Sequence, residues 1–588
     1  MKITRIFDIL NNYIEKYPDQ NSALACKRNG KWLRFSIGEY KEITDLISLG
    51  LIHAGLNPGD NIGIVGKNRP EWNMIDMAIM QAGGISVPIY PTISEQDYRF
   101  ILRHSEMKMI FIDGDEILKK LEPVIGEMPN LRECFLFDMD KQNRFRSLED
   151  LKKLGKENSD NEKLEAIKNG IKSTDLATII YTSGTTGNPK GVMLSHSNIV
   201  NQILNLCKTP AKWSKTALSF LPVCHAYERM MVYLYQYLGM SVYYAESIDT
   251  IAANIKEIRP TMMTCVPRLL EKIYDKLYHA GENLEGSKRS LYFWAFELAT
   301  KYQLEGMSFW LKLKLKIADK LIYSKWRAAI GGNFDIVVSG GSAIQPHIAS
   351  FFSAIGMPVF EGYGMSEASP VIAVSQRVKN GRKFGTVGLP LPGVEIRLSE
   401  MDEILCRGHN VMMGYYKDPE LTAKTIDKEG WLHTGDTGKF TKQGQLIITG
   451  RLKSIFKTSY GKYINPQLIE SKFTESPYFE NMMVLGENKK YAAAIIAPDF
   501  TFLKIMCDKA KLPCNNNIQM LENKIVMDQL EGEIKKFNEQ FGHSEQIKKW
   551  KIVSDQWSQD GGQLSPTLKI KRNVLEKLYQ KEIKELFE

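Results

Sequence analysis

The stretch that decides the fold is Tyr181-Thr-Ser-Gly-Thr-Thr-Gly-Asn-Pro-Lys-Gly191, which continues the apolar run Ala177–Tyr181. A short apolar run of this kind is typical of a buried strand. Glycines allow backbone N–H groups to turn toward an anion, hydroxyls donate hydrogen bonds to phosphate oxygens, and a lysine adds positive charge. The segment therefore predicts a phosphate-binding loop. Its candidate binding residues are Thr182, Ser183, Gly184, Thr185, Thr186, Gly187 and Lys190.

Two other interpretations of this loop are set aside. A Walker A loop has Gly before its Lys and Ser or Thr after it. Here Pro189 precedes Lys190 and Gly191 follows it, which excludes the P-loop NTPase class. A plain flexible turn requires neither a buried strand before it nor so many hydroxyls beside one lysine.

Further apolar runs predict more buried strands, and amphipathic segments typical of helices lie between many of them. These runs are Ile62–Val65, Met109–Ile112, Ser241–Tyr244, Phe334–Val338 and Val359–Glu361. Strands that alternate with helices favour parallel α/β sheets. From Val387 to Ile448 the strands are short and the turns frequent, which indicates a small β-rich subdomain.

The length of 588 residues is too great for one hydrophobic core, so we expect more than one domain. We predict an α/β fold whose large N-terminal domain, residues 1–452, combines parallel-rich sheets flanked by helices with the small β subdomain. A boundary near Lys453 separates it from a small α+β C-terminal domain, residues 453–588.

Composition narrows the classes of protein. The first eighteen residues contain no continuous apolar core of a signal peptide, and no run reaches the roughly 18 apolar residues that span a bilayer. The eight cysteines are scattered without a C-x-x-C pair, which argues against zinc knuckles and a disulfide framework and favours the cytoplasm. The net charge of +9 suits polyanionic cofactors or an anionic membrane, and no motif supports a nucleic-acid partner.

The segment from Ser290 to Ile330 is rich in aromatic residues and lysine. Its octet WLKLKLKI alternates as a strand does, but the spacing of Leu313, Ile317 and Leu321 favours a helix. Two interpretations stay open: a packed pair of surface helices, or a patch that lies on a lipid membrane.

The string YTSGTTGNPKG resembles the signature of the adenylate-forming superfamily, which includes acyl-CoA synthetases, peptide-synthetase adenylation domains and beetle luciferases. Phe360-Glu-Gly-Tyr-Gly-Met-Ser-Glu367 resembles its aromatic-Gly-x-Thr-Glu motif, with Ser366 where Thr is usual. The resemblance implies ATP and Mg²⁺ as cofactors, with Tyr363 against adenine. It makes Lys190 and Glu367 catalytic and Glu367 and Thr186 ligands of Mg²⁺. The implied nucleotide-binding residues of this motif are Glu361, Gly362, Tyr363, Gly364 and Ser366.

Three shorter motifs follow the order of the superfamily. Ser339-Gly-Gly-Ser-Ala343 resembles the loop beside adenine and the acyl group, which implies binding by Gly340, Gly341 and Ser342. Trp431-Leu-His-Thr-Gly-Asp436 resembles a motif whose aspartate accepts hydrogen bonds from ribose hydroxyls. Gly450-Arg-Leu-Lys453 resembles the next motif, in which Arg451 contacts ribose or phosphate and Lys453 is the hinge of a mobile C-terminal domain.

Gly561-Gly-Gln-Leu-Ser-Pro-Thr-Leu-Lys569-Ile-Lys-Arg572 resembles the loop that carries the catalytic lysine. The resemblance implies that Lys569 meets the carboxylate and the α-phosphate during adenylation. The carboxylate then attacks the α-phosphorus of ATP, which releases pyrophosphate and leaves an acyl-adenylate. After Lys569 withdraws, rotation at the hinge is implied to bring Gly461 against the pantetheine tunnel, where coenzyme A takes the acyl group as its second substrate.

Leu221-Pro-Val-Cys-His225-Ala-Tyr-Glu-Arg229 resembles the long-chain version of a superfamily motif. It implies that His225 is catalytic beside the carboxylate or forms a pocket wall, while a core histidine bonded to backbone remains the alternative. We therefore expect an ATP-dependent fatty acid–CoA ligase for medium- to long-chain acids, cytoplasmic or peripheral at the inner face of the membrane. The alternatives are an enzyme that loads acyl carrier protein, and a non-catalytic ATP- or lipid-binding homologue.

Overall fold

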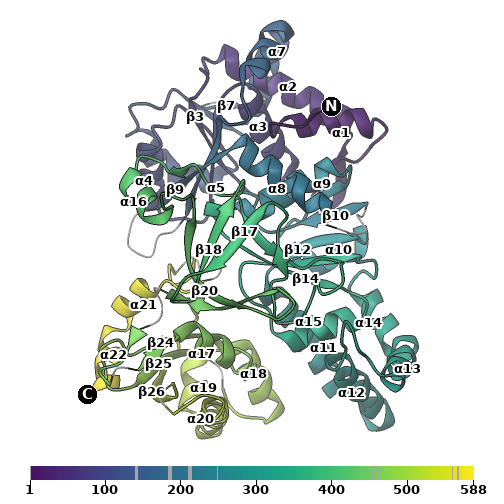
Figure 1. The fold of residues 1–588 in the computed structure, drawn as a ribbon, viewed down its shortest axis with the longest axis vertical. Coiled ribbons are helices and arrows are strands. Elements are labelled where there is room, and N and C mark those ends of the chain that lie inside the picture. The colour runs from purple at the N-terminus through teal and green to yellow at the C-terminus, as the bar shows by residue number, and fades with distance from the viewer. Residues whose placement is uncertain are drawn as a thin grey trace. The chain divides into compact units, whose positions relative to one another are not determined.

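The computed structural model describes residues 2–139, 144–182, 189–209, 215–247, 249–452, 456–460, 462–514, 516–543, 545–558, 561–565 and 569–588. The chain divides into two compact units, which are described one at a time. The first contains Met1–Arg397, Leu405–His433 and Phe440–Ile447, and the second contains Leu398–Ile404, Thr434–Lys439 and Ile448–Glu588. Figure 1 gives the order of the elements along the chain by colour.

One sheet of the first unit has the strand order β16-β15-β14-β13-β12-β10-β11-β1-β2. Its strands are β1 (Leu24–Arg28), β2 (Lys31–Phe35), β10 (Thr216–Ser219), β11 (Ser241–Tyr244), β12 (Met262–Cys265), β13 (Ile336–Ser339), β14 (Val359–Gly364), β15 (Val371–Val374) and β16 (Leu389–Pro390). The neighbours from β1 to β14 are parallel, whereas β2, β15 and β16 join their neighbours antiparallel. The carboxyl ends of β10, β12, β13 and β14 therefore meet at one edge.

A second sheet of the same unit has the order β19-β9-β8-β4-β3-β5-β6-β7. Its strands are β3 (Asn61–Val65), β4 (Ile85–Ile89), β5 (Met109–Ile112), β6 (Glu133–Leu136), β7 (Arg146–Ser147), β8 (Leu176–Thr182), β9 (Lys190–Ser195) and β19 (Gly414–Tyr415). The neighbours from β8 to β7 are parallel. Strands β3 and β5 are buried along their whole length, as continuous apolar runs predict.

The helices of this unit are α1 (Asp8–Lys16), α2 (Ile37–His53), α3 (Pro70–Gln81), α4 (Glu95–His104), α5 (Asp115–Ile125), α6 (Leu148–Glu157), α7 (Asn161–Gly170), α8 (His196–Lys208), α9 (Ala226–Tyr237), α10 (Ile251–Ile258), α11 (Pro267–Glu282), α12 (Gly286–Thr300), α13 (Phe309–Ala318), α14 (Ser324–Ala329), α15 (Pro346–Ala354) and α16 (Pro419–Thr425). A π-helical turn, η1 (Asp319–Tyr323), joins α13 to α14, and a 3₁₀ turn, η2 (Ser366–Ala368), follows β14. No helix in the described part of the chain is long and apolar enough to cross a membrane.

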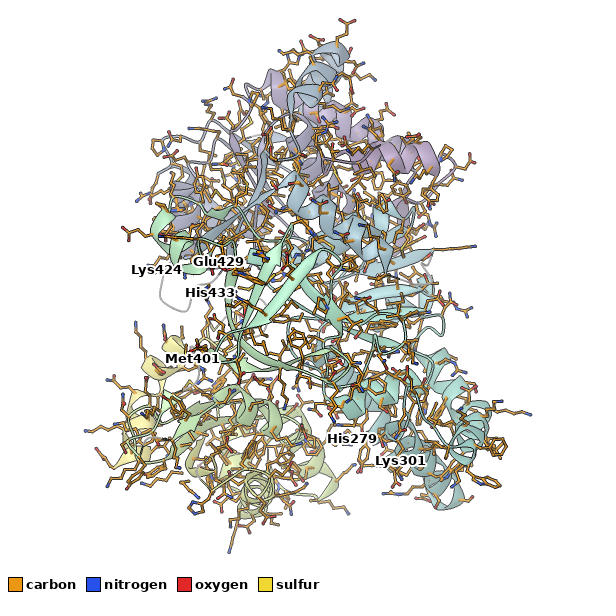
Figure 2. The ribbon with its side chains drawn as sticks, in the orientation of Figure 1. His279, Lys301, Met401, Lys424, Glu429 and His433 are labelled. Atoms are coloured by element: carbon orange, nitrogen blue, oxygen red, sulfur yellow. The ribbon has the colours of Figure 1, made fainter. Side chains whose placement is uncertain are left out.

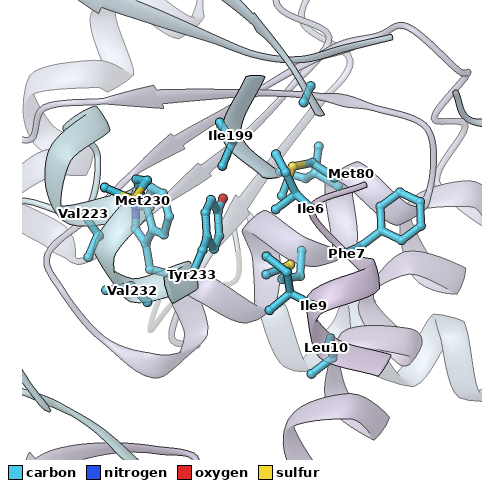
Figure 3. Packing of buried hydrophobic residues seen from close by; sticks show 14 of the residues in the cluster. Ile6, Phe7, Ile9, Leu10, Met80, Ile199, Val223, Met230, Val232 and Tyr233 are labelled. Carbon is cyan, nitrogen blue, oxygen red and sulfur yellow. The ribbon is translucent and has the colours of Figure 1, made fainter. Parts of the chain in front are cut away.

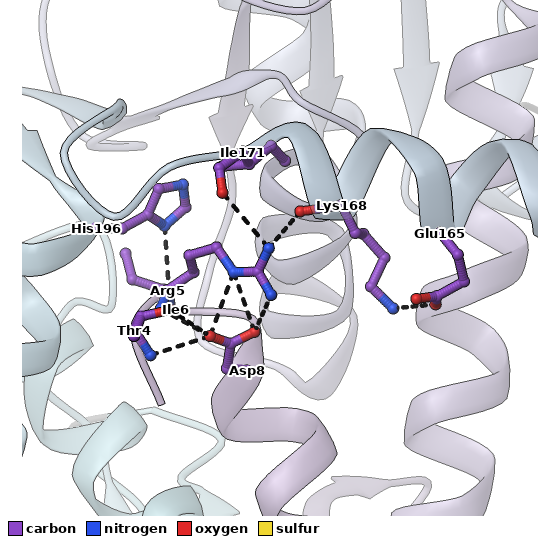
Figure 4. A network of polar contacts seen from close by, with 8 residues as sticks. All are labelled: Thr4, Arg5, Ile6, Asp8, Glu165, Lys168, Ile171 and His196. Carbon is purple, nitrogen blue, oxygen red and sulfur yellow. Dashed lines mark hydrogen bonds and ion pairs between the residues drawn. The ribbon is translucent and has the colours of Figure 1, made fainter. Parts of the chain in front are cut away.

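The main core of the first unit joins the start of the chain to α3, α8 and α9. Figure 3 shows side chains from this cluster, among them Ile6, Phe7, Ile9, Leu10, Met80, Ile199, Met230 and Tyr233. A polar network fixes the same terminus (Figure 4): Asp8 accepts hydrogen bonds from Arg5, whose guanidinium also donates to the carbonyls of Lys168 and Ile171. Burial alone raises the pKa of Asp8, but the Arg5 and backbone hydrogen bonds outweigh it and lower the pKa.

The remaining sheets have the orders β17-β18-β20-β21, β22-β23 and β24-β25-β26. Their strands are β17 (Val394–Leu398), β18 (Glu403–Gly408), β20 (Leu432–Phe440), β21 (Leu446–Arg451), β22 (Phe456–Lys457), β23 (Tyr463–Ile464), β24 (Phe479–Leu485), β25 (Ala492–Pro498) and β26 (Ile547–Ile552). The helices of the second unit are α17 (Pro466–Phe473), α18 (Phe500–Lys509), α19 (Asn517–Glu522), α20 (Lys524–Asn538), α21 (Arg572–Leu578) and α22 (Gln580–Phe587).

The predicted α/β class is confirmed, as are the predicted buried strands, which coincide within a few residues with β3, β5, β8, β11, β13 and β14. The octet WLKLKLKI lies in α13, so the longer spacing predicted its structure and the strand-like alternation did not. The region from Val387 to Ile448 is rich in strands, as predicted, and it also contains the helix α16. The domain boundary at residues 452 and 453 stays a prediction, and Lys453 lies outside the described residues.

Candidate functional site

The two ends of the predicted phosphate loop face each other in the first unit. Strands β8 and β9 pair antiparallel, and Thr182 lies opposite Lys190 at the point where the hairpin opens. The hairpin therefore brings together the first and last of the candidate phosphate-binding residues. The other residues of that prediction, Ser183, Gly184, Thr185, Thr186 and Gly187, lie outside the described residues.

The hairpin is tightly packed around Gly191, the residue after Lys190. A Cβ atom there would lie 2.8 Å from Cγ2 of Ile179, which leaves no room for a side chain. The backbone N–H of Tyr416 donates to the carbonyl of Gly191 over 2.7 Å. His104 also contacts the hairpin, and its Nδ1 lies 2.9 Å from the hydroxyl of Tyr181. Sequence reasoning missed His104, because nothing in its own segment connects it with β8.

Glu367 and Lys190 gather around a third residue, Tyr415. The Tyr415 hydroxyl donates to Oε1 of Glu367 over 2.9 Å, and Nζ of Lys190 lies 5.7 Å from the centre of the Tyr415 ring. Burial, and after it the Glu367 charge, raises the pKa of Tyr415, so the phenol keeps the proton that it donates. Tyr415 reaches this position because β19 pairs with β9, opposite Val192.

Of the two predicted Mg²⁺ ligands, Glu367 is among the described residues and Thr186 is not. Among the described residues, no group of three or more His, Cys, Asp or Glu side chains could hold a metal ion. Glu367 instead offers a single carboxylate that is hydrogen-bonded to Tyr415, whose ring centre lies 5.7 Å from the Lys190 amine. One carboxylate suits a Mg²⁺ ion that takes its other ligands from phosphate oxygens and water. The residues present therefore fit an ion that arrives with a nucleotide.

An apolar cavity of about 110 Å³ lies in the first unit. Residues of three predicted motifs line it: His225, Gly340, Gly341, Gly362, Tyr363 and Gly364. The rest of its wall is mostly apolar and comes from Leu206, Thr209, Tyr227, Met231, Leu234, Met262, Ile336, Val338, Phe360, Met365, Pro370, Val371, Val374, Ser375, Gln376 and Arg377. These motifs meet because they follow, or end, parallel strands of one sheet.

Other predicted residues of the same motifs do not line this cavity. Ser342 is exposed, and Ser366 is buried in η2. Glu361 is buried, and its backbone carbonyl accepts a hydrogen bond of 2.8 Å from Ser375 N–H. Burial raises the pKa of Glu361 to about 8, although a backbone hydrogen bond and the Arg382 charge act against the shift.

His225 shows features of both interpretations: it is hydrogen-bonded to backbone, and it forms part of the pocket wall. It is the N-cap of α9, and its Nδ1 accepts a hydrogen bond of 3.2 Å from the backbone N–H of Tyr227. The same side chain lines the cavity. Gly340 also lines the cavity, and Tyr227 leaves little room for a larger residue there. A Cβ atom at Gly340 would lie 3.0 Å from the tyrosine ring.

The second unit brings together Asp436, Arg451 and Lys569. Nε of Arg451 donates to Oδ1 of Asp436 over 2.8 Å. Burial of the amine, followed by the Arg451 charge, lowers the pKa of Lys569, and Asp436 acts in the opposite direction. Gly461, like Lys453, lies outside the described residues.

Comparisons with known proteins agree with these motifs. A family model described as AMP-binding enzyme matches residues 10–416, and one described as AMP-binding enzyme C-terminal domain matches residues 453–588. The chain is 31% identical to the long-chain-fatty-acid–CoA ligase FadD15 of Mycobacterium bovis, over 95% of this chain and 93% of the relative. It is 30% identical to fatty acyl-CoA synthetase A of Dictyostelium discoideum, over 94% of this chain and 86% of the relative.

Solved structures share the fold. The adenylation domain of the carboxylate reductase from Mycobacterium chelonae superposes with a TM-score of 0.75 at 19% identity, covering 99% of this chain and 91% of that one. The anthranilate CoA ligase AuaEII, solved with anthranoyl-AMP, superposes with a TM-score of 0.69 at 16% identity, covering 98% and 97%.

Proposed function

This chain belongs to the AMP-binding, adenylate-forming enzyme family, and we propose that it is an ATP-dependent fatty acid–CoA ligase for medium- to long-chain acids. In the first step the fatty acid carboxylate attacks the α-phosphorus of ATP, which gives acyl-AMP and pyrophosphate. In the second step the thiol of coenzyme A takes the acyl group, which gives acyl-CoA and AMP. Relatives named as long-chain ligases and acyl-CoA synthetases support this substrate class.

The observation that carries the proposal is the apolar cavity of the first unit. Its wall is made mostly of aliphatic and aromatic side chains, and Arg377 is the one residue with a permanent charge among the described residues that line it. Such a wall stabilises the part of an alkyl chain that enters the cavity, by removing that part from water. An amino acid or a dicarboxylate would need charged partners inside the cavity.

The first half-reaction requires that negative charges approach each other. A carboxylate repels the triphosphate that it attacks, so the site must neutralise charge and align the reacting atoms. We assign the first task to Lys190 and Lys569. Mg²⁺, when bound, supplies further positive charge to the phosphates, and Glu367 is the residue proposed to hold it. Tyr415 keeps that carboxylate oriented through its hydrogen bond.

Alignment is assigned to the motifs at the edge of the first sheet. Gly340 and Gly341, together with Gly362–Gly364, present backbone beside the cavity, where Tyr363 offers a ring for stacking against adenine. His225 stands at the same cavity as the N-cap of α9. In the second unit, Asp436 and Arg451 are proposed to bind ribose and phosphate.

The second half-reaction is assigned to other residues of the second unit. The proposal has Lys569 withdraw after adenylation through rotation at Lys453, and Gly461 then lie beside the pantetheine arm. No protein nucleophile is required, because the activated acyl group passes directly from AMP to the thiol.

The test is acid-dependent release of pyrophosphate from ATP, measured for acetate, octanoate, palmitate, benzoate and an amino acid, each with and without CoA. We expect the greatest release with octanoate or palmitate, and acyl-CoA among the products when CoA is present. If the fatty acyl-AMP reacts with acyl carrier protein and not with CoA, the acceptor is acyl carrier protein. Absence of release with every acid would mean that the chain binds ATP or lipid without catalysis.

A further inference from the structure

Two large aromatic side chains lie at the surface of the first unit. Phe309 is 73% exposed and Trp310 is 69% exposed, both at the start of α13. Aromatic residues of this size normally bury most of their area, so a pair left in water marks a surface with a partner. Figure 1 shows α13 at the outer edge of a group of helices with α11, α12 and α14.

The opposite face of this segment is fixed to the body of the unit. Leu315, Ala318, Tyr323 and Trp326 are buried. The Tyr323 hydroxyl donates to the carbonyl of Ala295 in α12 over 2.8 Å, and the ring of Trp326 meets that of Tyr292 at 5.0 Å. The exposed side chains therefore belong to a firmly attached helix, and their outward direction is part of the fold.

The exposed apolar residues form one stripe along the helix. Trp310 is followed by Leu313, Ile317 and Leu321, at steps of three, four and four residues. Their exposed fractions are 69%, 39%, 46% and 42%. Residues at such steps share one face of a helix. The segment from Phe309 to Ala329 runs through α13, η1 and α14, which gives a rod about 30 Å long at ~1.5 Å per residue.

Basic residues surround the stripe. Between Gly306 and Phe334 the sequence has five lysines and one arginine but only one acid, Asp319. That acid is already paired with Arg327. The lysines Lys312, Lys314, Lys316, Lys320 and Lys325 are all exposed. Long lysine side chains can lie along an apolar surface while their amines reach toward negative charge in the headgroup layer.

We propose that this face, the stripe with its lysines, binds the surface of an anionic lipid bilayer, with the helix parallel to the membrane plane. The apolar stripe enters the boundary between headgroups and acyl chains, and the lysines contact anionic headgroups. A spanning orientation is excluded, because charged lysines along the segment would have to enter the hydrocarbon. A second copy of the chain fits this face poorly, since two such faces would place like charges against each other.

The test is flotation of the full chain with vesicles of phosphatidylcholine alone or of an equal mixture with phosphatidylglycerol. We expect the wild type to float with the mixed vesicles, and its binding to weaken as salt rises. The double variant Phe309→Ser/Trp310→Ser should bind at least about tenfold more weakly. The triple variant Lys312→Gln/Lys316→Gln/Lys320→Gln should lose about fivefold per lysine.

Matched controls lie elsewhere in the chain and are labelled in Figure 2: Met401→Ser, at a residue 67% exposed, and Lys424→Gln on α16. Both should float as the wild type does. The proposal fails if the wild type does not float, or if the double variant floats as well as the controls. It also fails if sedimentation shows a wild-type dimer that the double variant dissociates while flotation is unchanged, because the stripe would then be a protein interface.

Flotation needs no ATP, fatty acid or CoA, so its result is independent of the pyrophosphate assay. A chain that binds vesicles but releases no pyrophosphate would overturn the proposed function and keep the membrane surface. A chain that releases pyrophosphate but does not float would keep the proposed function and overturn the membrane surface.

Discussion

The hydroxyl of Tyr415 donates a hydrogen bond to the Glu367 carboxylate over 2.9 Å. The two residues are 48 positions apart in the sequence, and the Lys190 amine lies against the same tyrosine ring. We propose that Tyr415 holds the Glu367 carboxylate in the direction from which it meets Mg²⁺. Tyr415 is then a positioning residue, and its loss should act on the metal requirement.

Replacing Tyr415 by phenylalanine removes the hydroxyl and keeps the ring. A hydrogen bond to a charged group is worth about 1.5–3 kcal/mol, so we expect pyrophosphate release at limiting Mg²⁺ to fall about tenfold or more. High Mg²⁺ should restore part of the rate. Tyr416→Phe is the matched control, because its hydroxyl lies 3.3 Å from Asn61 Nδ2 and not beside Glu367. If the Mg²⁺ dependence of Tyr415→Phe equals that of the wild type, Tyr415 does not orient the Glu367 carboxylate for Mg²⁺.

Glu367→Gln should weaken Mg²⁺-dependent turnover further than Tyr415→Phe while the protein stays folded. An amide has the size of the carboxylate but lacks the negative charge that attracts a divalent cation. Turnover is measured as pyrophosphate release across a Mg²⁺ series, and folding by circular dichroism. Near-wild-type activity with the same Mg²⁺ dependence would show that Glu367 is not the ligand.

Lys569→Ala should abolish formation of acyl-adenylate and spare the transfer of a preformed acyl-adenylate to CoA. In the proposed mechanism the amine supplies positive charge only where the carboxylate attacks the α-phosphorus. Each half-reaction is assayed alone, with Lys571→Ala as the control in the same loop. Equal loss of both half-reactions in Lys569→Ala would point to damage of the fold instead.

Leu234→Trp should shift acid preference toward shorter chains. Leu234 is buried on α9 and lines the apolar cavity, so a larger side chain takes up volume that the proposed function assigns to the acyl chain. We expect the ratio of kcat/KM for palmitate over octanoate to fall about tenfold, with a stability cost of about 1–3 kcal/mol. Leu234→Met conserves the volume and should keep the wild-type ratio. An unchanged ratio in Leu234→Trp would show that this cavity does not bind the acyl chain.

Glu361→Gln should change how stability depends on pH. A glutamate in an unfolded chain titrates near ~4.3, whereas burial raises the pKa of Glu361 to about 8. Between these values the folded chain binds more protons than the unfolded chain, so this residue's contribution to the free energy of unfolding falls as pH rises. The fall is at most about 1.4 kcal/mol per pH unit. Urea unfolding should therefore show a smaller loss between mildly acidic and mildly alkaline pH in Glu361→Gln, and an equal loss in both proteins would contradict the shift.

Much of the fold could be predicted because buried parallel strands appear in the sequence as continuous apolar runs. The runs that became β3 and β5 are apolar from end to end, which follows from burial on both faces. The hairpin of β8 and β9 was foreseen only in part, as a strand that feeds a loop. The pairing of Thr182 with Lys190 depends on the return strand, whose mixed sequence gives no strong signal.

The partners of the candidate residues could not be predicted for a different reason. Tyr415 and His104 approach the site from segments far away in the sequence, through an edge strand and the end of a helix. The sequence around each of these two residues contains no pattern that indicates which residue it contacts. Asp436 and Arg451 were foreseen as separate motifs, but their direct hydrogen bond appears only when β20 and β21 lie in one sheet.

The pairing of Thr182 with Lys190 also has an entropic consequence. Bringing two distant points of a chain together has a conformational cost, and here the sheet ladder already holds Thr182 opposite Lys190. That cost is incurred when the protein folds and not when a nucleotide arrives. More of the interaction energy with the phosphates is then available as affinity, as expected for a receptor that is preorganised before its ligand binds.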